Sequence, residues 1–219
     1  MQRKDKTARI ACIAVMIVFL LTNLAVGIYY LLQGVAYSYV LAFSALLLPL
    51  VLTGLYRLLR YRRVYQLDIL IYAFFLALYT VGLSMYGYHR IPLYDKFAHT
   101  FAGVFTSILA LILFYVLKPK KEIEKSDFPL VCVFTLSVSV AVAGVWEIAE
   151  FIISLIFGTD PQNVQGTGVG DTMWDIIVCT AGALVMLIPY AFYYQKGKRD
   201  LFMKSFELMF ERNIKPSKN

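Results

Sequence analysis

Charged residues are scarce in this chain of 219 residues. Asp, Glu, Lys and Arg make up 16% of it, whereas hydrophobic residues make up 60%. A soluble domain of this length would be about a quarter charged. The composition therefore excludes an ordinary soluble domain, and it predicts that membrane lipid is the main partner of the protein surface.

Cysteine and histidine are also rare, with three and two residues respectively. Cys12, Cys132 and Cys179 fall inside apolar runs, and their spacing fits neither a disulfide framework nor a zinc site. We expect them to pack as small apolar side chains. The Gly-rich segment 158–171 has no P-loop lysine and follows an apolar run rather than a strand, so we expect no nucleotide or other cofactor-binding motif there.

Six apolar runs are each about as long as the hydrocarbon core of a bilayer requires. The sequence shows no internal repeat, and no low-complexity linker separates the apolar runs into two domains. The sequence therefore predicts an all-α fold, a polytopic membrane helical bundle in residues 1–195, followed by a cytoplasmic tail of residues 196–219. The six predicted transmembrane helices are residues 10–32, 37–56, 67–86, 96–117, 129–157 and 172–194.

The basic residues indicate how these helices are oriented. Four lie before the first span, four follow the second span, four follow the fourth span and seven lie in the tail, which accounts for 19 of the 21. With six spans, only Arg90 and Lys96 fall on the opposite side. The positive-inside rule then predicts a multi-pass cell-membrane protein with both termini in the cytoplasm. Because the net charge of +7 follows the topology, we expect no nucleic-acid partner.

The tail contains a segment with helical periodicity. Phe202, Phe206, Met209 and Phe210 recur at helical spacing, with charged residues between them. This pattern predicts an amphipathic helix that lies on the inner leaflet. We expect it to adhere to lipid rather than to bind a specific partner.

A group of ionisable residues lies in or directly beside the outer ends of the last three predicted spans. They form three pairs with i, i+3 or i, i+4 spacing, so the members of each pair share a helix face. Polar faces in a membrane bundle turn toward the protein interior or a watery cavity. We therefore predict one shared pocket between these helices. Its members are Asp95, His99, Glu147, Glu150, Asp171 and Asp175.

Carboxylates that share a membrane pocket repel one another unless they are protonated, paired with a cation or bound to a metal. A carboxylate-rich ligand set suits Mg²⁺ or Mn²⁺ better than zinc. The predicted metal ligands are Glu147, Glu150, Asp175 and His99. The predicted catalytic residues are His99, Asp95 and Asp171, with His99 as a ligand or general base. The residues predicted to contact a substrate headgroup are Lys96 and Arg90.

Each of these residues also has a structural interpretation. Asp95 and Asp171 open helices, where Asp commonly caps free N–H groups. His99 could be a hydrogen-bonded bundle histidine. Lys96 could extend to the membrane surface, and Arg90 could be a solvated loop residue. The sequence leaves these alternatives open.

Three motifs resemble a known family in combination. They are 94-YDKFAHTFAG-103, 146-WEIAEF-151 and 170-GDTMWDIIVCTAGAL-184. The chain resembles the YjdF-like family of bacterial inner-membrane proteins and is more distantly similar to the VanZ-like family, which shows Asp-Lys-x-x-His, a Glu on the next helix, and Asp-x-x-x-Asp. The resemblance implies a cell-envelope setting and, for the VanZ-like branch, an association with glycopeptide resistance. It implies no established reaction.

Together these features predict an integral membrane protein that acts as a metal-assisted hydrolase or transferase. Its substrate would be a lipid or lipid-linked cell-envelope molecule at the outer face. The alternatives are a proton- or cation-coupled transporter, in which the acids form a relay, and a non-catalytic membrane scaffold, in which they form a buried polar lock. The lack of an internal repeat counts against transport. The sequence indicates neither the substrate nor the oligomeric state.

Overall fold

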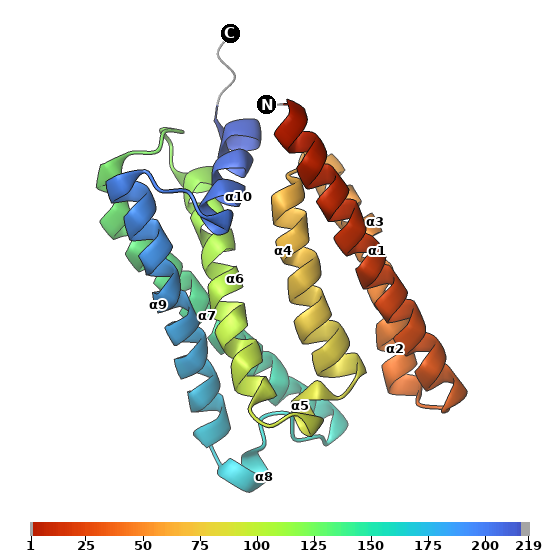
Figure 1. Ribbon diagram of the computed structural model, residues 1–219. Helices are drawn as coiled ribbons and strands as arrows, with labels where there is room; N and C mark the ends of the chain where they lie inside the picture. Colours follow the sequence, from red (N-terminus) through yellow and green to blue (C-terminus); the bar gives the residue numbers. More distant parts are fainter. Residues whose placement is uncertain (1, 216–219) are drawn as a thin grey trace. The chain divides into compact units, whose positions relative to one another are not determined.

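The computed structural model describes the backbone of residues 2–215 and the side chains of residues 5–215. Helices dominate this part of the chain, which contains no strand, so the predicted all-α class is confirmed (Figure 1). Five helices are long and apolar enough to cross a membrane, and a bent helix pair makes a sixth candidate span. Arg3, Lys4 and Lys218, which entered the orientation argument, lie outside the described side chains.

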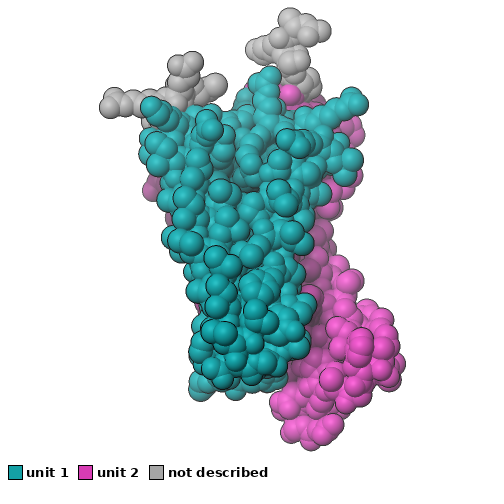
Figure 2. All heavy atoms as spheres, turned by 90° about the vertical axis from the view of Figure 1, so that its right-hand side faces the viewer, with its two compact units in different colours: residues 1–94, 207–213 teal, residues 95–206, 214–219 magenta. Residues whose placement is uncertain are grey.

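The chain divides into two compact units, which Figure 2 distinguishes by colour. Unit 1 comprises Met1–Tyr94 and Glu207–Asn213, and unit 2 comprises Asp95–Phe206 and Ile214–Asn219. Each unit is described by itself below. The predicted division into residues 1–195 and a tail stays a prediction.

In unit 1, the long helix α1 packs against α2 and α4. The apolar core of this unit includes Cys12 and Phe19 of α1 and Tyr72 of α4, so Cys12 lies where a small apolar side chain is expected. The elements of this unit are α1 (Gln2–Leu32), α2 (Ala36–Ala45), α3 (Leu48–Leu58), α4 (Tyr65–Phe75) with its π-helical continuation η1 (Leu76–Ser84), and α5 (Gly87–Arg90).

The second predicted span is interrupted. Helices α2 and α3 are bent by 41° at the break between Ala45 and Leu48. Pro49 lies in the first turn of α3, where its missing N–H would have no helical partner in any case. A proline ring also clashes with the carbonyl group four residues earlier in a continuous helix, here that of Ala45, where α2 ends. The apolar run 37–56 therefore forms two helices rather than one.

Unit 2 contains the helices that carry the predicted pocket. Helix α7 packs against α9 over much of its length. The elements are α6 (Tyr94–Leu117), the 3₁₀ turn η2 (Lys125–Asp127), α7 (Phe128–Phe157), the single turn α8 (Val164–Thr167) and α9 (Gly170–Lys196). The boundary between the units falls within the last two elements, α10 (Leu201–Met209) and the π-helical turn η3 (Phe210–Ile214).

Helices α6 and α9 meet at two glycines. A Cβ atom on Gly103 of α6 would overlap the carbonyl oxygen of Cys179, and one on Gly182 of α9 would overlap the carbonyl oxygen of Thr100. Small residues at such a crossing allow two membrane helices to approach backbone to backbone. Each backbone therefore fills the notch left by the other helix's glycine.

The tail departs from the prediction. Phe206 is buried by protein rather than open to a membrane, because it packs against the rings of Tyr115 and Tyr193 within unit 2. The expectation that this side chain rests on the inner leaflet is therefore corrected, whereas the cytoplasmic location of the tail stays a prediction. The fully or almost fully buried tail side chains are Met203, Ser205, Phe206, Met209 and Phe210.

Within unit 1, polar contacts link Arg212 and Asn213 to residues much earlier in the chain. Arg212 places Nη2 2.8 Å from Asp5 Oδ1, and its Nη1 donates to the carbonyl oxygen of Arg63 at 2.9 Å. Asn213 also exchanges hydrogen bonds with the backbone of Arg62. Residues that are distant in sequence thereby hold the end of the chain in place.

Candidate functional site

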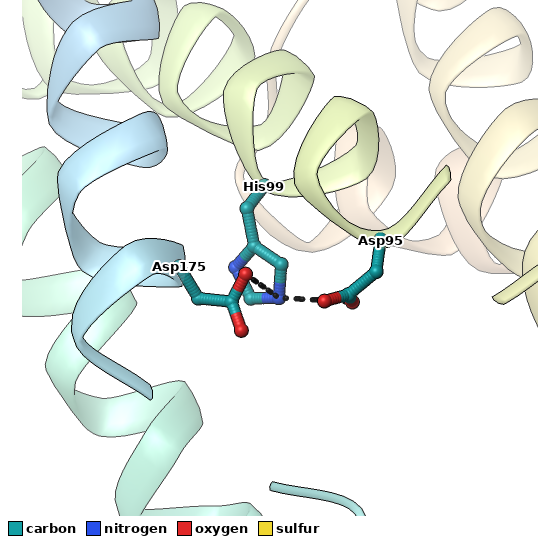
Figure 3. A group of neighbouring side chains, drawn as sticks. All are labelled: Asp95, His99 and Asp175. Atoms are coloured by element: carbon teal, nitrogen blue, oxygen red, sulfur yellow. Dashed lines mark ion pairs between the residues drawn. The ribbon is translucent and has the colours of Figure 1, made fainter. Parts of the chain in front are cut away.

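The first turns of α6 and the second turn of α9 bring three predicted site residues together. Asp95 and His99 lie four residues apart on α6 and share a face. Asp175 projects from α9 toward them and is only 3% exposed (Figure 3). The glycine crossing of α6 and α9 begins one turn further along each helix, so it places these side chains opposite each other.

Lys96 supplies the positive charge that the carboxylates require. Its Nζ lies 2.9 Å from Asp95 Oδ2, 2.6 Å from Asp171 Oδ1 and 2.7 Å from Asp175 Oδ1. The side chain is one-quarter exposed, so it bridges α6 and α9 instead of extending freely to the surface. Three carboxylates therefore converge on one ammonium group.

These ion pairs count against the alternative that Asp171 serves only as a helix cap. The residue before α9, Val169, makes no side-chain cap hydrogen bond, and Asp171 directs its carboxylate at Lys96. Asp95 does the same from α6. Both residues thus join the cluster, although a carboxylate in the first turn also stabilises the helix dipole.

His99 lies between two of the carboxylates. Its Nε2 is 3.6 Å from Asp95 Oδ1 and 3.8 Å from Asp175 Oδ1, the pairs joined by dashed lines in Figure 3. One ligand atom from each of the three residues lies within 4.8 Å of the others, which is close enough to hold one metal ion. With His99 neutral, three carboxylates against one ammonium leave two negative charges. Both the donor set and the charge fit a divalent cation.

Glu147 is buried, at 5% exposure, but it belongs to a different contact group. Its Oε2 and its backbone carbonyl each accept a hydrogen bond from Nε2 of Gln162 at 3.1 Å. The same nitrogen lies 3.2 Å from Thr172 Oγ1. Oε1 of Glu147 is buried without a hydrogen-bond partner. Glu147 is near enough to His99 to interact with it electrostatically.

Gln162 is the site residue that sequence reasoning missed. It lies in the segment between α7 and α9 and is 9% exposed. A single Gln among Gly, Thr and Asn residues has no periodicity or spacing that would predict burial. Only the folded segment shows that its amide reaches α7 and α9 together.

Glu150 has a partner on its own helix. Trp146, one turn earlier on α7, donates from Nε1 to Glu150 Oε1 at 2.8 Å. Among residues 5–215, the group of side chains able to hold a metal includes neither Glu150 nor Glu147. It contains His99 and Asp175 of the four predicted ligands and adds Asp95. A metal role for the two glutamates stays a prediction.

Arg90 belongs to unit 1. Its guanidinium lies over the ring of Tyr86 at 5.3 Å, and Nη1 donates to the hydroxyl of Tyr30 at 3.4 Å. These contacts position Arg90 at one end of unit 1. Its predicted contact with a substrate headgroup stays a prediction.

The fold and the site define a multi-pass, all-α membrane protein that holds an acid–lysine–histidine cluster among membrane-spanning helices. The chain belongs to the family described as predicted membrane protein (DUF2238), whose family model matches residues 11–196. No curated protein and no solved structure matches it. The narrower resemblance to the YjdF-like and VanZ-like families stays a prediction.

Proposed function

We propose that the protein is a divalent-cation-dependent hydrolase or transferase. Its substrate would be a phosphate or ester group of a lipid or lipid-linked cell-envelope molecule at the outer face of the cell membrane. The observation that carries the proposal is the convergence of Asp95, His99 and Asp175 from two crossing helices, with ligand atoms within 4.8 Å. Structural ion pairs do not require a histidine between two carboxylates.

The residues divide into three roles. Asp95, His99 and Asp175 hold Mg²⁺ or Mn²⁺, and a cation bound there supplies Lewis-acid polarisation of a phosphoryl or carbonyl oxygen. Lys96 lies beside that position. Each of its three N–H donors has a carboxylate partner, so a substrate phosphate would bind Lys96 by taking the place of one carboxylate. Asp171 orients Lys96 through its 2.6 Å ion pair. The catalytic role predicted for Asp171 stays a prediction.

The outer-face location rests on the distribution of basic residues. It is tested by placing single cysteines at the two predicted sides of the membrane, Gln165→Cys in α8 or Lys121→Cys between α6 and α7, in a protein whose Cys12, Cys132 and Cys179 are replaced by alanine. In intact cells, a membrane-impermeant maleimide should label position 165, and it should label position 121 only after lysis. The reverse pattern would place the site on the cytoplasmic side.

A second candidate is proton- or cation-coupled transport, and the buried polar residues further along unit 2 favour it. Ser139 of α7 lies 3.2 Å from Ser107 of α6, oxygen to oxygen, and Tyr190 of α9 donates to the Ser107 carbonyl. The Ser107 carbonyl accepts this hydrogen bond, but it carries no proton to pass on, so it cannot be a step in a proton relay. Fully buried Leu111 and almost fully buried Met186 also belong to this part of α6 and α9. The enzyme is therefore the better-supported candidate.

Mn²⁺ binding to detergent-purified protein tests the proposal, with electron paramagnetic resonance to count free and bound ion. We expect about one ion per chain and a loss of affinity of about tenfold or more in Asp175→Asn and in His99→Gln. His89→Gln, which changes the chain's other histidine, is the matched control and should bind as wild type does. Absence of specific Mn²⁺ and Mg²⁺ binding in the wild type would reject the enzyme. Flux of protons that depends on Asp175 in proteoliposomes would then support transport.

A further inference from the structure

The amide nitrogen of Gln162 occupies a site with more acceptors than it can satisfy. Three oxygens surround Nε2 at 3.1–3.2 Å: the backbone and Oε2 oxygens of Glu147 and Oγ1 of Thr172. An amide nitrogen carries only two hydrogens. The reverse orientation of the amide would place its oxygen against both Glu147 acceptors, so the nitrogen must face them.

Glu147 also has charge and hydrogen-bonding capacity to spare. Its Oε1 is buried with no partner, and among residues 5–215 the side-chain hydrogen bond to its other oxygen comes from the neutral amide of Gln162. A neutral amide satisfies one carboxylate oxygen and offers no positive charge. The site therefore lacks a third donor and a cation, both of which a buried carboxylate requires.

A primary ammonium group supplies both missing elements, because it carries three N–H donors and one positive charge. We propose that Glu147 and Thr172 bind the primary ammonium of an aminophospholipid headgroup, such as phosphatidylethanolamine, and that Gln162 occupies this site until the lipid displaces it. The ligand is a lipid rather than a free amine because both residues lie on candidate membrane-spanning helices.

A metal ion would fit this site poorly. A hard divalent cation requires about six oxygen ligands, and Glu147 is not among the residues, within 5–215, whose ligand atoms lie close enough together to hold one. The ammonium site and the proposed cation site are also neighbours in the chain. Thr172 directly follows Asp171, whose carboxylate binds Lys96. In a headgroup whose phosphate and ammonium are separated by two carbons, the ammonium would bind Glu147 and Thr172 while the phosphate binds at the cation site.

The segment between Gly158 and Gly168, which carries Gln162, can move as one unit. Gly158 ends α7 with φ +64°, and Gly168 precedes α9 with φ +63°. A Cβ atom on either glycine would meet nothing within 4 Å. Between them, Asp160 accepts hydrogen bonds from the backbone N–H groups of Val164 and Gln165. The segment thus keeps its own internal bonds when Gln162 leaves Glu147.

This inference deepens the proposed function and rests on it only for the reaction, since binding can be measured without divalent cation. The thermal unfolding midpoint of the detergent-purified protein is measured with short-chain phosphatidylethanolamine, short-chain phosphatidylcholine or free phosphoethanolamine. A ligand that binds only the folded state raises the midpoint. We expect the largest rise with phosphatidylethanolamine, because the trimethylated headgroup keeps the charge but has no N–H donor. Equal rises with the two lipids would overturn the proposal, and an equal rise with free phosphoethanolamine would overturn its assignment to a lipid.

The substitution Gln162→Lys tests the site directly, because it places a tethered ammonium where the amide lies. We expect this variant to fold and to bind phosphatidylethanolamine about tenfold or more weakly. Gln165→Lys, the same change three residues later in the same segment, is the matched control and should keep the wild-type preference. Glu147→Gln should lose that preference. If Gln162→Lys keeps the wild-type preference for phosphatidylethanolamine, the proposal is overturned. This result does not depend on whether Glu147→Gln folds.

The two proposals can fail separately. Loss of Mn²⁺ binding by the wild type, with the aminophospholipid preference intact, would reject the cation-dependent reaction and leave the ammonium site. Normal Mn²⁺ binding, with no preference for the primary amine, would reject the ammonium site and leave the cation site.

Discussion

Gly103 of α6 lies directly against the carbonyl group of Cys179 on α9, in space that any larger side chain would need. The contact has a functional consequence because of its position. His99 lies one turn before Gly103, and Asp175 lies one turn before Cys179. The close approach of the two backbones therefore sets the register in which the histidine meets the carboxylate.

Replacing Gly103 with alanine should destabilise the protein, since the new methyl group meets backbone that cannot rotate away. We expect a loss of about 1–3 kcal/mol, together with weaker Mn²⁺ binding, measured by unfolding in detergent and by ion titration. Gly144→Ala is the matched control, because a Cβ there meets nothing within 4 Å. It should be neutral or slightly stabilising. Equal effects of the two substitutions would contradict the proposed register contact.

Lys96→Met should be more damaging than most substitutions of a lysine. It leaves Asp95, Asp171 and Asp175 without their shared cation, and Asp175 is almost fully buried. Breaking a buried pair costs about 3–5 kcal/mol, and the partial exposure of Lys96 reduces the expected loss to about 2–3 kcal/mol.

Lys120→Met is the matched control for this change. Lys120 also bridges carboxylates, those of Glu122 and Glu124, but on the protein surface. Solvent-screened pairs contribute little to stability. Unfolding should therefore distinguish the two variants, and similar small effects would show that Lys96 does not hold the cluster together.

Tyr115→Phe tests whether the buried polar cluster at the opposite end of unit 2 affects stability without affecting Mn²⁺ binding at the candidate site. The hydroxyl of Tyr115 lies 2.7 Å from Asp127 Oδ2 and 2.8 Å from the hydroxyl of Tyr194. Losing it from this buried cluster should cost about 1–3 kcal/mol. Tyr194 lies about 28 Å along α9 from Asp175, so Mn²⁺ affinity should not change. Tyr29→Phe, at an exposed tyrosine, is the control for stability, and a changed Mn²⁺ affinity in Tyr115→Phe would favour a relay that links the two ends.

Arg212→Ala should loosen the end of the chain, because Arg212 binds both Asp5 and the backbone of Arg63. We expect faster backbone hydrogen exchange in residues 210–215, measured by mass spectrometry in detergent. Arg57→Ala, at an exposed arginine of α3, should leave that exchange unchanged. If membrane adhesion held the tail instead, detergent alone would abolish its protection and Arg212→Ala would add nothing.

The helical membrane architecture and most members of the acidic cluster could be predicted from the order of residues alone. Apolar runs of bilayer length specify spanning helices because the hydrocarbon core requires internally satisfied backbone. The spacing of Asp95 and His99, or of Asp171 and Asp175, is a local property of one helix. It could therefore be predicted without knowing where any other helix lies.

Which of these groups come into contact depends on how the helices pack, and this could not be predicted from the sequence. Lys96 binds three carboxylates because the glycines at the α6–α9 crossing let the two backbones approach closely. The periodicity of each helix by itself does not predict the register between α6 and α9. Glu147 meets Gln162 instead because the segment between α7 and α9 folds back onto both helices. The tail is covered by protein for a similar reason. An amphipathic face shows that apolar side chains will be buried, but it does not show whether lipid or another part of the chain covers them.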